Sequence, residues 1–285
     1  MYRRLLVPTD GSETALAAGE TAIELAKLVH AEIHVISVAD TGDLPTLTDE
    51  MREDLRAYSG EAVEAVADLA REAGIETTTE IEDGDPVECL LAAAEANAVD
   101  LVVMGTHGRS GLGRLALGSI TERTLRTSSV PVMTVREETA LAPVESILVP
   151  TDGSACANRA LDHAAALAVE TDAALHIVHV VDVSVVARDI DATPVLDALE
   201  VAGERALEAA TSRATDAGVT SVQASVVSGR PNRSVCTYAE TQDIDLVVMG
   251  THGRTGLSEK LLGSVTERVV RESPVPVITL RAVED

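Results

Sequence analysis

The chain has 285 residues, of which 46% are hydrophobic and 24% are charged, a composition typical of a globular protein. Its 47 acidic residues outnumber its 22 basic ones, and the formal net charge of −25 opposes binding to nucleic acid. The chain lacks Phe and Trp, which leaves few rings for stacking on bases, and no apolar run approaches the roughly 18 residues of a membrane span. Nucleic-acid-binding and membrane proteins are therefore excluded.

The beginning of the chain and its charge indicate where the protein works. The opening "MYRRLLVP" is too short for a secretory segment before Thr9 and Asp10, so we expect a cytoplasmic protein. The acidic excess has two interpretations, a well-solvated surface or adaptation to near-molar salt, in which charges are screened within about 3 Å. We favour the second, a protein from a halophile. The three cysteines fit no metal-site spacing and are expected to be ordinary helix residues.

In the first half of the chain, short β-branched runs alternate with longer helical stretches, which predicts βαβ units. Strands are expected near Arg3–Pro8, Glu32–Val38, Glu76–Glu82, Leu101–Met104 and Val130–Val135. Helices are expected to start near Ser12, Thr48, Pro86 and Ser119. Near-continuous apolar strands such as "LVVM" indicate burial on both faces, and right-handed crossovers then give a five-stranded, doubly wound parallel sheet flanked by helices, a Rossmann-like α/β fold.

Local signals support these helix starts. Ser12 and Thr48 are good N-cap residues, and "GDP" at residues 84–86 supplies a turn glycine, an Asp cap and a proline at the first helical position. The second half repeats the scheme with "GRP" at residues 229–231.

The second half of the chain is a copy of the first. "LLVPTDGS" at residues 5–12 returns as "ILVPTDGS" at residues 147–154, and residues 100–135 match residues 245–280 at 24 of 36 positions without a gap. We therefore predict two tandem domains, residues 1–140 and 144–285, each long enough for its own core.

The fifth strand of each copy contains a proline that cannot donate to a ladder. Pro131 and Pro276 place these strands at a sheet edge or a strand start. Because a bare apolar edge invites aggregation, we expect the two domains to pair through their last strands, and a homodimer of the whole chain stays open.

The two loops best reproduced between the copies are "PTDGS" after the first strand and "GTHGRSGLGRLALGS" after the fourth. In a doubly wound sheet these loops meet beyond the carboxyl ends of the strands, where ligands bind. We expect Gly105, Gly108 and Gly118 to adopt positive φ and let backbone N–H groups approach an anion, while Ser119 begins a helix whose dipole favours negative charge. The sequence thus predicts a phosphate-binding site.

The glycine spacing is shared by both copies: Gly105-x2-Gly108-x9-Gly118-Ser119 recurs as Gly250-x2-Gly253-x9-Gly263-Ser264. It is neither a P-loop nor a dinucleotide fingerprint. Together with "VPTDGS", it resembles the universal stress protein family in its ATP-binding branch, whose signature is G-x2-G-x9-G followed by Ser or Thr. The resemblance covers essentially the whole chain and implies two tandem domains of the adenine nucleotide alpha hydrolase-like fold that bind ATP in a stress response.

The resemblance also implies which residues line the adenosine pocket, contact adenine through the backbone, and hold ribose and phosphates. In the first copy these are Pro8, Thr9, Asp10, Val38, Met104, Gly105, His107, Gly108, Arg109, Gly118, Ser119 and Thr121. In the second copy they are Pro150, Thr151, Asp152, Val180, Met249, Gly250, His252, Gly253, Arg254, Gly263, Ser264 and Thr266. One departure puts the first adenine pocket in doubt, because Ser37 precedes Val38 whereas His179 precedes Val180.

Mg²⁺ or Mn²⁺ would be held mainly by the phosphates, which needs few protein ligands. Simpler roles remain open for several of these residues: Asp10 and its counterpart as helix caps, His107 and its counterpart as loop braces, and Arg109 and its counterpart as solvated charges. Arg123 and Arg268 are expected to pair with nearby acids. The remaining histidines are interpreted as structural: His30, His34, His163, His176 and His179.

The sequence favours a binding protein over an enzyme. It offers no carboxylate placed for a metal and no water-orienting Gln, although slow ATP hydrolysis stays open. The alternative is an interaction or scaffold protein of the same fold that binds no nucleotide. A phospho-receiver domain would need an acidic pair near Asp10 and a Lys near the last strand, and the sequence has neither. Protein partners are unknown at this point.

Overall fold

The computed structural model describes residues 1–40, 48–108, 117–139, 143–183, 193–253 and 261–281. The chain divides into two compact units, Tyr2–Ala142 and Pro143–Asp285, called the first and second unit below. Within the described residues, no helix has both the length and the apolar character needed to cross a membrane.

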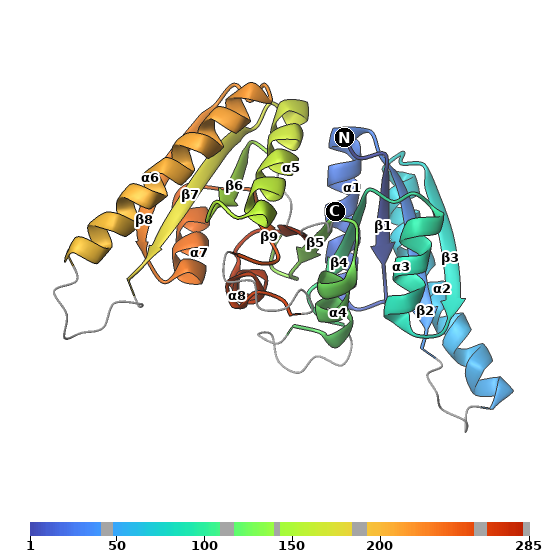
Figure 1. Cartoon of the computed structure of the whole chain (residues 1–285). Helices are drawn as coiled ribbons and strands as arrows, with labels where there is room; N and C mark the ends of the chain where they lie inside the picture. The colour runs from blue at the N-terminus through green and yellow to red at the C-terminus, as the bar shows by residue number, and fades with distance from the viewer. Residues whose placement is uncertain (41–47, 109–116, 140–142, 184–192, 254–260, 282–285) are drawn as a thin grey trace. The chain divides into compact units, whose positions relative to one another are not determined.

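The first unit is a doubly wound α/β domain (Figure 1). Its elements in chain order are β1 (Arg4–Pro8), α1 (Glu13–Val29), β2 (Glu32–Ala39), α2 (Asp49–Glu72), β3 (Thr77–Asp83), α3 (Pro86–Ala96), β4 (Leu101–Gly105), α4 (Ser119–Thr127) and β5 (Val132–Val135). The strands are parallel and lie in the order β3-β2-β1-β4-β5. Helix α1 packs against α2 and α3 packs against α4, so helices cover both faces of the sheet. The order reverses between β1 and β4, which is the switch point of the sheet.

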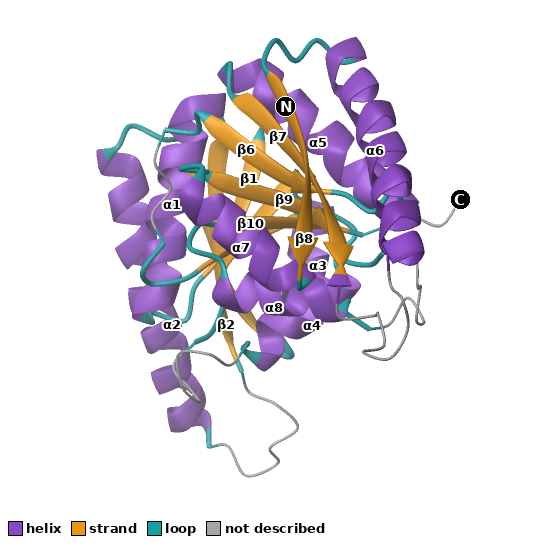
Figure 2. Cartoon of the chain, turned by 90° about the vertical axis from the view of Figure 1, so that its left-hand side faces the viewer, coloured by secondary structure: helices purple, strands orange, loops and turns teal. Residues whose placement is uncertain are grey.

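The second unit repeats this architecture (Figure 2). Its elements are β6 (Ser146–Pro150), α5 (Ala155–Thr171), β7 (Ala174–Asp182), α6 (Thr193–Asp216), β8 (Val222–Gly229), α7 (Pro231–Thr241), β9 (Leu246–Gly250), α8 (Ser264–Glu272) and β10 (Val277–Leu280). The parallel order is β8-β7-β6-β9-β10. The predicted fold class, a parallel sheet flanked by helices in each half, is confirmed.

The central strands carry the core. Leu5, Leu6 and Val7 of β1 have no exposed surface, and residues 101–104 of β4 are buried as well. Both faces of these strands are covered by helices, which is why their sequences are apolar without alternation. Each fully buried Leu contributes about 1.5–3 kcal/mol relative to an exposed one. Strand β5 begins at Val132, two residues later than expected, so Pro131 immediately precedes the strand and needs no ladder N–H.

Helices begin where the sequence placed their caps. The Ser12 hydroxyl accepts the N–H of Ala15, and the Thr48 hydroxyl accepts that of Met51. Asp85 caps α3, with Pro86 at the first helical position. These predictions are confirmed, and each cap satisfies a first-turn N–H that would otherwise lack an acceptor.

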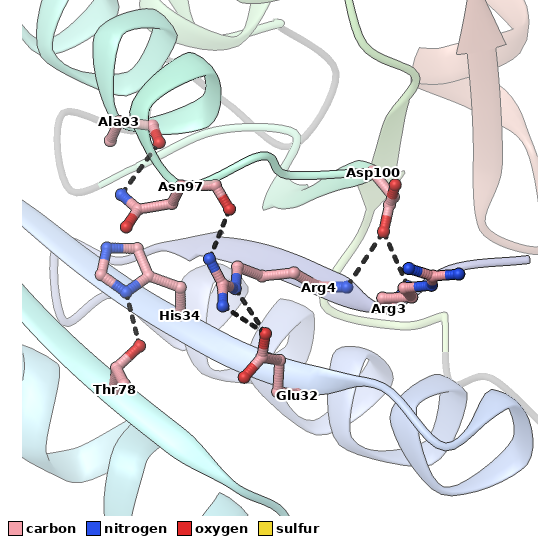
Figure 3. Close-up of polar contacts among 8 residues, drawn as sticks. All are labelled: Arg3, Arg4, Glu32, His34, Thr78, Ala93, Asn97 and Asp100. Carbon is pink, nitrogen blue, oxygen red and sulfur yellow. Dashed lines mark hydrogen bonds and ion pairs between the residues drawn. The ribbon is translucent and has the colours of Figure 1, made fainter.

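A polar network fixes the amino ends of the strands in the first unit (Figure 3). The Asp100 carboxylate, just before β4, accepts the N–H groups of Arg3 and Arg4 at the start of β1. The Arg4 guanidinium in turn donates to Glu32 on β2 and to the Asn97 carbonyl. The three strands are thus held in register at this end. Their carboxyl ends, and the loops that follow them, are positioned as a consequence.

Candidate functional site

A cavity of about 540 Å³ lies at the carboxyl ends of β1, β2 and β4 in the first unit, within the size range of small-molecule sites. It is closed laterally by the first turns of α3 and α4. Its walls are formed by Pro8, Thr9, Asp10, Ala15, Ile36, Val38, Asp40, Pro86, Leu90, Met104, Gly105, His107, Gly108, Gly118, Ser119, Ile120 and Thr121. The second unit has a corresponding cavity of about 400 Å³.

The structure brings together eleven of the twelve site residues that the sequence predicted in each unit. In the first unit the twelfth residue, Arg109, lies outside the described residues. In the second unit the same holds for Arg254. The other eleven there are Pro150, Thr151, Asp152, Val180, Met249, Gly250, His252, Gly253, Gly263, Ser264 and Thr266. Their role as ATP ligands stays a prediction.

Sequence reasoning missed six wall residues in each unit. Ile36 and Asp40 stand two positions from Val38, so strand alternation turns all three toward the cavity. Pro86 and Leu90 share one face of α3 because they are four residues apart. These two periodicities were available as signals. The remaining missed residues are Ala15 and Ile120 in the first unit, and Ala157, Val178, Asp182, Pro231, Val235 and Val265 in the second.

Helix α4 begins without a side-chain cap. Its N-cap residue is Gly118, and the first-turn residues Ser119, Ile120 and Thr121 all line the cavity. Helix α8 starts in the same way at Gly263. First-turn N–H groups have no acceptor within their own helix, so these two helix starts offer donors and a favourable dipole to an anion in the cavity.

The glycines of the motif do not adopt the conformation expected of them. Gly118 has φ of −65°, and none of the motif glycines is among those with positive φ. A Cβ atom added to Gly108 would lie 2.3 Å from Asp10 Oδ2, and one added to Gly118 would lie 3.2 Å from His107 Cα. The expectation of positive φ was therefore wrong. These positions exclude side chains because the glycine loop packs directly against itself and against the loop after β1.

Asp10 both shapes its loop and lines the cavity. Its Oδ1 atom accepts the N–H of Ser12 at 3.1 Å, which closes a turn just before α1, whereas the helix itself is capped by Ser12. Asp152 holds Ser154 in the same way at 2.9 Å. Capping α1 is therefore not the role of Asp10, and its carboxylate is held at the cavity wall.

The two loop histidines differ in how they are held. In the first unit, His107 Nδ1 contacts Thr106 Oγ1 at 3.1 Å and Nε2 contacts Thr14 Oγ1 at 3.2 Å. The position of Thr14 is taken by Cys156 in the second unit. His252 keeps the contact through Nδ1, at 2.9 Å from Thr251 Oγ1, but its buried Nε2 has no hydrogen-bond partner among the described residues. Bracing of the loop is thus seen at both histidines, and it is complete only at His107.

The Ser37 and His179 difference reaches the wall of the second cavity through the backbone, because His179 Nδ1 lies 2.9 Å from the carbonyl oxygen of Thr151, which lines that cavity. These residues alternate with the lining residues of β2 and β7, so they face the other side of the sheet. His179 packs against Gly203 of α6, where an added Cβ would lie 2.5 Å from the imidazole ring. The departure at Ser37 therefore remains a difference between the two pockets.

The rims of the two cavities carry different charges. Arg123 of α4 donates to both carboxylate oxygens of Asp85, at 2.8 and 3.2 Å, and lowers the pKa of that carboxyl below its usual range. The expected pairing of Arg123 with an acid is confirmed. Arg268, its counterpart in α8, has no acidic partner among the described residues, and the position of Asp85 is taken by Arg230.

This difference predicts that replacing Asp85 and replacing Arg230 by alanine change the stability of the protein by different amounts. Asp85→Ala is expected to lower the free energy of unfolding by about 1 kcal/mol, because α3 loses its N-cap. Arg230→Ala should change it by less than about 0.5 kcal/mol, since Arg230 makes no side-chain cap. Urea unfolding followed by circular dichroism measures both, and equal losses in the two variants would contradict the assignment of the caps.

The fold and the cavities define a class: a protein of two tandem, doubly wound α/β domains, each with a small-molecule cavity at its switch point. The sequence profile described as the Universal stress protein family matches residues 1–136 and 143–281. The chain belongs to the universal stress protein family.

Individual relatives agree with this membership. A universal stress protein of Methanocaldococcus jannaschii is 36% identical over 142 residues, which cover 48% of this chain and 84% of the relative. A tandem-length relative in Mycobacterium tuberculosis strain H37Rv is 29% identical and covers 97% of this chain and 96% of its own. The crystal structure of a universal stress protein from Archaeoglobus fulgidus superposes with a TM-score of 0.76 at 28% identity, covering 99% of this chain and 97% of that one.

Proposed function

We propose that each cavity binds ATP and that the protein acts as a nucleotide-dependent module of a stress response. The observation that carries this proposal is the pair of uncapped helix starts, α4 and α8, whose first-turn residues line the two cavities. The glycine spacing of the ATP-binding branch lies at the same place in both units, which supports a nucleotide over other anions.

The wall residues fit the parts of ATP. Ile36, Val38 and Met104 supply an aliphatic surface for adenine in a chain that has no Phe or Trp. The first turn of α4 supplies donors for phosphate oxygens, beginning at Ser119. No group of three His, Cys, Asp or Glu side chains among the described residues is arranged to hold a metal ion, so Mg²⁺ or Mn²⁺ would be bound mainly through the phosphates.

The net negative charge of the chain repels ATP, which itself carries about four negative charges. Favourable interactions within the cavity must therefore outweigh this repulsion. A helix N-terminus contributes about 0.3–2 kcal/mol, and each backbone N–H bonded to a charged oxygen adds about 1.5–3 kcal/mol. Distant carboxylates are screened within about 10 Å at 0.1 M salt and within about 3 Å at 1 M salt. Several short-range bonds therefore outweigh the long-range repulsion.

The experiment that tests the proposal is native mass spectrometry of the full chain, purified without added nucleotide and then titrated with ATP. We expect up to two nucleotides per chain. A chain that binds none at millimolar ATP would instead favour the alternative, a scaffold protein of the same fold. Single-turnover assays on the bound form separate binding from catalysis, since rapid metal-dependent release of phosphate would contradict a non-enzymatic role.

We also infer adaptation to a salt-rich cytoplasm from the net charge of −25. Raising KCl from about 0.1 M to about 1 M shortens the screening length from about 10 Å to about 3 Å and so weakens the repulsion among carboxylates. The melting temperature should rise by at least about 5 °C, the effect of about 1–2 kcal/mol in a domain of this size. Scanning calorimetry across the salt series measures it, and a constant or falling melting temperature would contradict the inference.

Pairing of the domains through their last strands remains part of the proposal, because the prolines before β5 and β10 give both strands an edge character. Residues 1–140 expressed alone should then self-associate through β5. Sedimentation of that fragment, with Met133→Lys as the variant that disrupts the edge, tests it. A fragment that stays monomeric at all concentrations would count against the pairing.

A further inference from the structure

The imidazole of His179 contacts the wall of the second cavity from the opposite face of the sheet. His179 lies on β7 between Val178 and Val180, both of which line the cavity, so its own side chain points to the other face. Its Nδ1 atom lies 2.9 Å from the carbonyl oxygen of Thr151. Because a carbonyl oxygen only accepts hydrogen bonds, Nδ1 carries a hydrogen and is the donor.

The carbonyl that accepts this hydrogen bond belongs to the loop after β6. Thr151 and the next residue, Asp152, both line the cavity. Asp152 Oδ1 accepts the N–H of Ser154 at 2.9 Å, and a Cβ added to Gly253 would lie 2.6 Å from Asp152 Oδ2. The bond from the imidazole therefore restrains the peptide group between two wall residues, one of which packs against the glycine loop.

Helix α6 provides the space for the imidazole. A Cβ added to Gly203 would lie 2.5 Å from Cδ2 of His179 and 3.2 Å from its Nε2, so a larger residue there would displace the ring. Helices α2 and α6 both have 24 residues, and Ser59 takes the position of Gly203 in the first. Ser37 takes the position of His179, and both serines are buried. The ring and the glycine thus occur together in the second unit, and two serines replace them in the first.

The loop after β1 repeats the turn of the second unit without this hydrogen bond. Asp10 Oδ1 accepts the N–H of Ser12 at 3.1 Å. The Tyr58 hydroxyl of α2 lies beside Gly11, where an added Cβ would be 2.9 Å from it. The carbonyl of Thr9 accepts no side-chain hydrogen bond among the residues that the structure describes. Within that part of the chain, the restraint on the carbonyl of the second unit therefore has no counterpart in the first.

We propose that His179 is a positioning residue for the ligand of the second cavity: its Nδ1–H group fixes the Thr151 carbonyl and thereby orders the cavity wall before the ligand arrives. The inference rests on the proposed function, since the ligand is taken to be ATP. A wall that is already ordered does not lose conformational entropy when the ligand binds. Removing the donor should therefore weaken binding in the second cavity and leave the first cavity, which has Ser37 at this position, unchanged.

Two methionines allow the cavities to be followed separately. Of the five methionines in the chain, Met104 lines the first cavity and Met249 lines the second. Met133 is buried outside both walls and serves as an internal reference. The full chain, labelled with ¹³C in the methionine methyl groups, is titrated with ATP and followed by NMR. Met104→Leu and Met249→Leu serve only to assign the two resonances, and the titration then gives one dissociation constant for each cavity.

Two substitutions of His179 separate the hydrogen-bond donor from the ring. His179→Asn keeps a donor close to the position of Nδ1, since both nitrogens are bonded to Cγ, whereas His179→Leu keeps an apolar side chain and removes the donor. In His179→Leu the affinity of the second cavity for ATP should fall about threefold to tenfold, the effect of one hydrogen bond. His179→Asn should recover most of this loss. A residue that acted only by packing beside Gly203 would give the opposite order, because leucine fills more of the space.

His176→Leu is the matched control on the same strand. His176 is buried, and its Nδ1 atom lies 3.2 Å from the Tyr238 hydroxyl, away from the residues of the cavity wall. This variant also removes a histidine and its hydrogen bond from β7, so it accounts for a general loss of stability. It should change the affinity of the second cavity for ATP by less than about twofold, because it does not contact the loop after β6.

The outcomes separate this inference from the proposed function. A loss of affinity reported by Met249 in His179→Leu, restored in His179→Asn and absent at Met104, supports the positioning role. Unchanged affinity in His179→Leu overturns it and leaves ATP binding intact, and equal losses in both variants overturn it as well, because the donor would then not matter. If His179→Leu does not fold, His179→Ser, with the residue of the first unit, takes its place. If neither Met104 nor Met249 responds to millimolar ATP, the proposed function fails together with the inference.

Discussion

The double variant Gly118→Val and Gly263→Val is expected to lose ATP binding at both cavities, with affinity reduced at least about a hundredfold, or roughly 2.7 kcal/mol. The backbone conformation is not the reason, since Gly118 and Gly263 have extended, negative φ that valine tolerates. The cause is the added side chain. At Gly118 a Cβ would press on His107 Cα at 3.2 Å, and at Gly263 on the Thr251 carbonyl oxygen at 2.8 Å.

These contacts lie where the two halves of each glycine loop meet. The Gly118 N–H donates to the Thr106 carbonyl at 2.8 Å, and the Gly263 N–H donates to the Thr251 carbonyl at the same distance. A valine would separate the strand end from the start of α4 or α8 and displace the first-turn donors from the cavity. Single variants should therefore reduce the stoichiometry from two nucleotides to one, which calorimetric titration resolves.

Gly60→Val provides the matched control for this experiment. Gly60 lies on α2, and an added Cβ would meet only Ile81 Cδ1 at 3.7 Å, an ordinary contact. Its ATP stoichiometry and affinity should equal those of the unchanged chain. A folded double variant that still binds two nucleotides with unchanged affinity would show that the glycine loops do not form the site.

The sequence was sufficient for the fold because its signals are local and agree with one another. Ser12, Thr48 and Asp85 are caps whose acceptors bond to N–H groups two or three residues away, so their spacing alone places the helix starts. The uninterrupted apolar strands reflect burial on both faces of a parallel sheet. Helix caps and apolar strands depend on residues close together in the sequence, so they can be recognised from one sequence alone.

The conformation of the motif glycines could not be predicted in the same way. A loop position can require glycine because the backbone adopts positive φ there, or because another part of the protein approaches the backbone closely. The sequence does not distinguish these two reasons. Positive φ occurs instead at Gly11 and Gly153, in the loop after the first strand of each unit. Gly108 packs against the carboxylate of Asp10, a residue almost a hundred positions away, and only the folded chain brings these two together.

The exchange of Asp85 for Arg230 illustrates a further limit. Both residues were visible in "GDP" and "GRP", and the sequence correctly placed a cap at the first. The second does not supply a cap, because Arg230 makes no side-chain hydrogen bond at the start of α7. The sequence predicted two equivalent sites, and the residues of the two cavity walls agree with this. The difference in charge beside the cavities became visible only through the ion pair between Arg123 and Asp85 in the first unit.

Substitutions at Gly19 of α1 and Val66 of α2 should be strongly coupled in their effect on the free energy of unfolding. A Cβ added to Gly19 would lie 2.8 Å from Val66 Cγ1, so Gly19→Leu should destabilise the first unit by roughly 3 kcal/mol through overpacking. The corresponding positions in the second unit are Leu161 and Ala210, a large and a small residue, both buried. The double variant Gly19→Leu and Val66→Ala reproduces that arrangement and should recover most of the lost stability.

Val66→Ala alone should cost about 2 kcal/mol, because it leaves a cavity against Gly19. The two substitutions would then be non-additive by up to about 3 kcal/mol, as expected for residues in direct contact. The free energy of unfolding from urea titrations of the four chains gives this coupling. The mirrored pair, Leu161→Gly and Ala210→Val, should show the same sign in the second unit. If the losses in free energy of unfolding were additive in both units, other contacts would set the distance between the two helices of each pair. The exchange of a small and a large residue between the two copies would then not contribute to that distance.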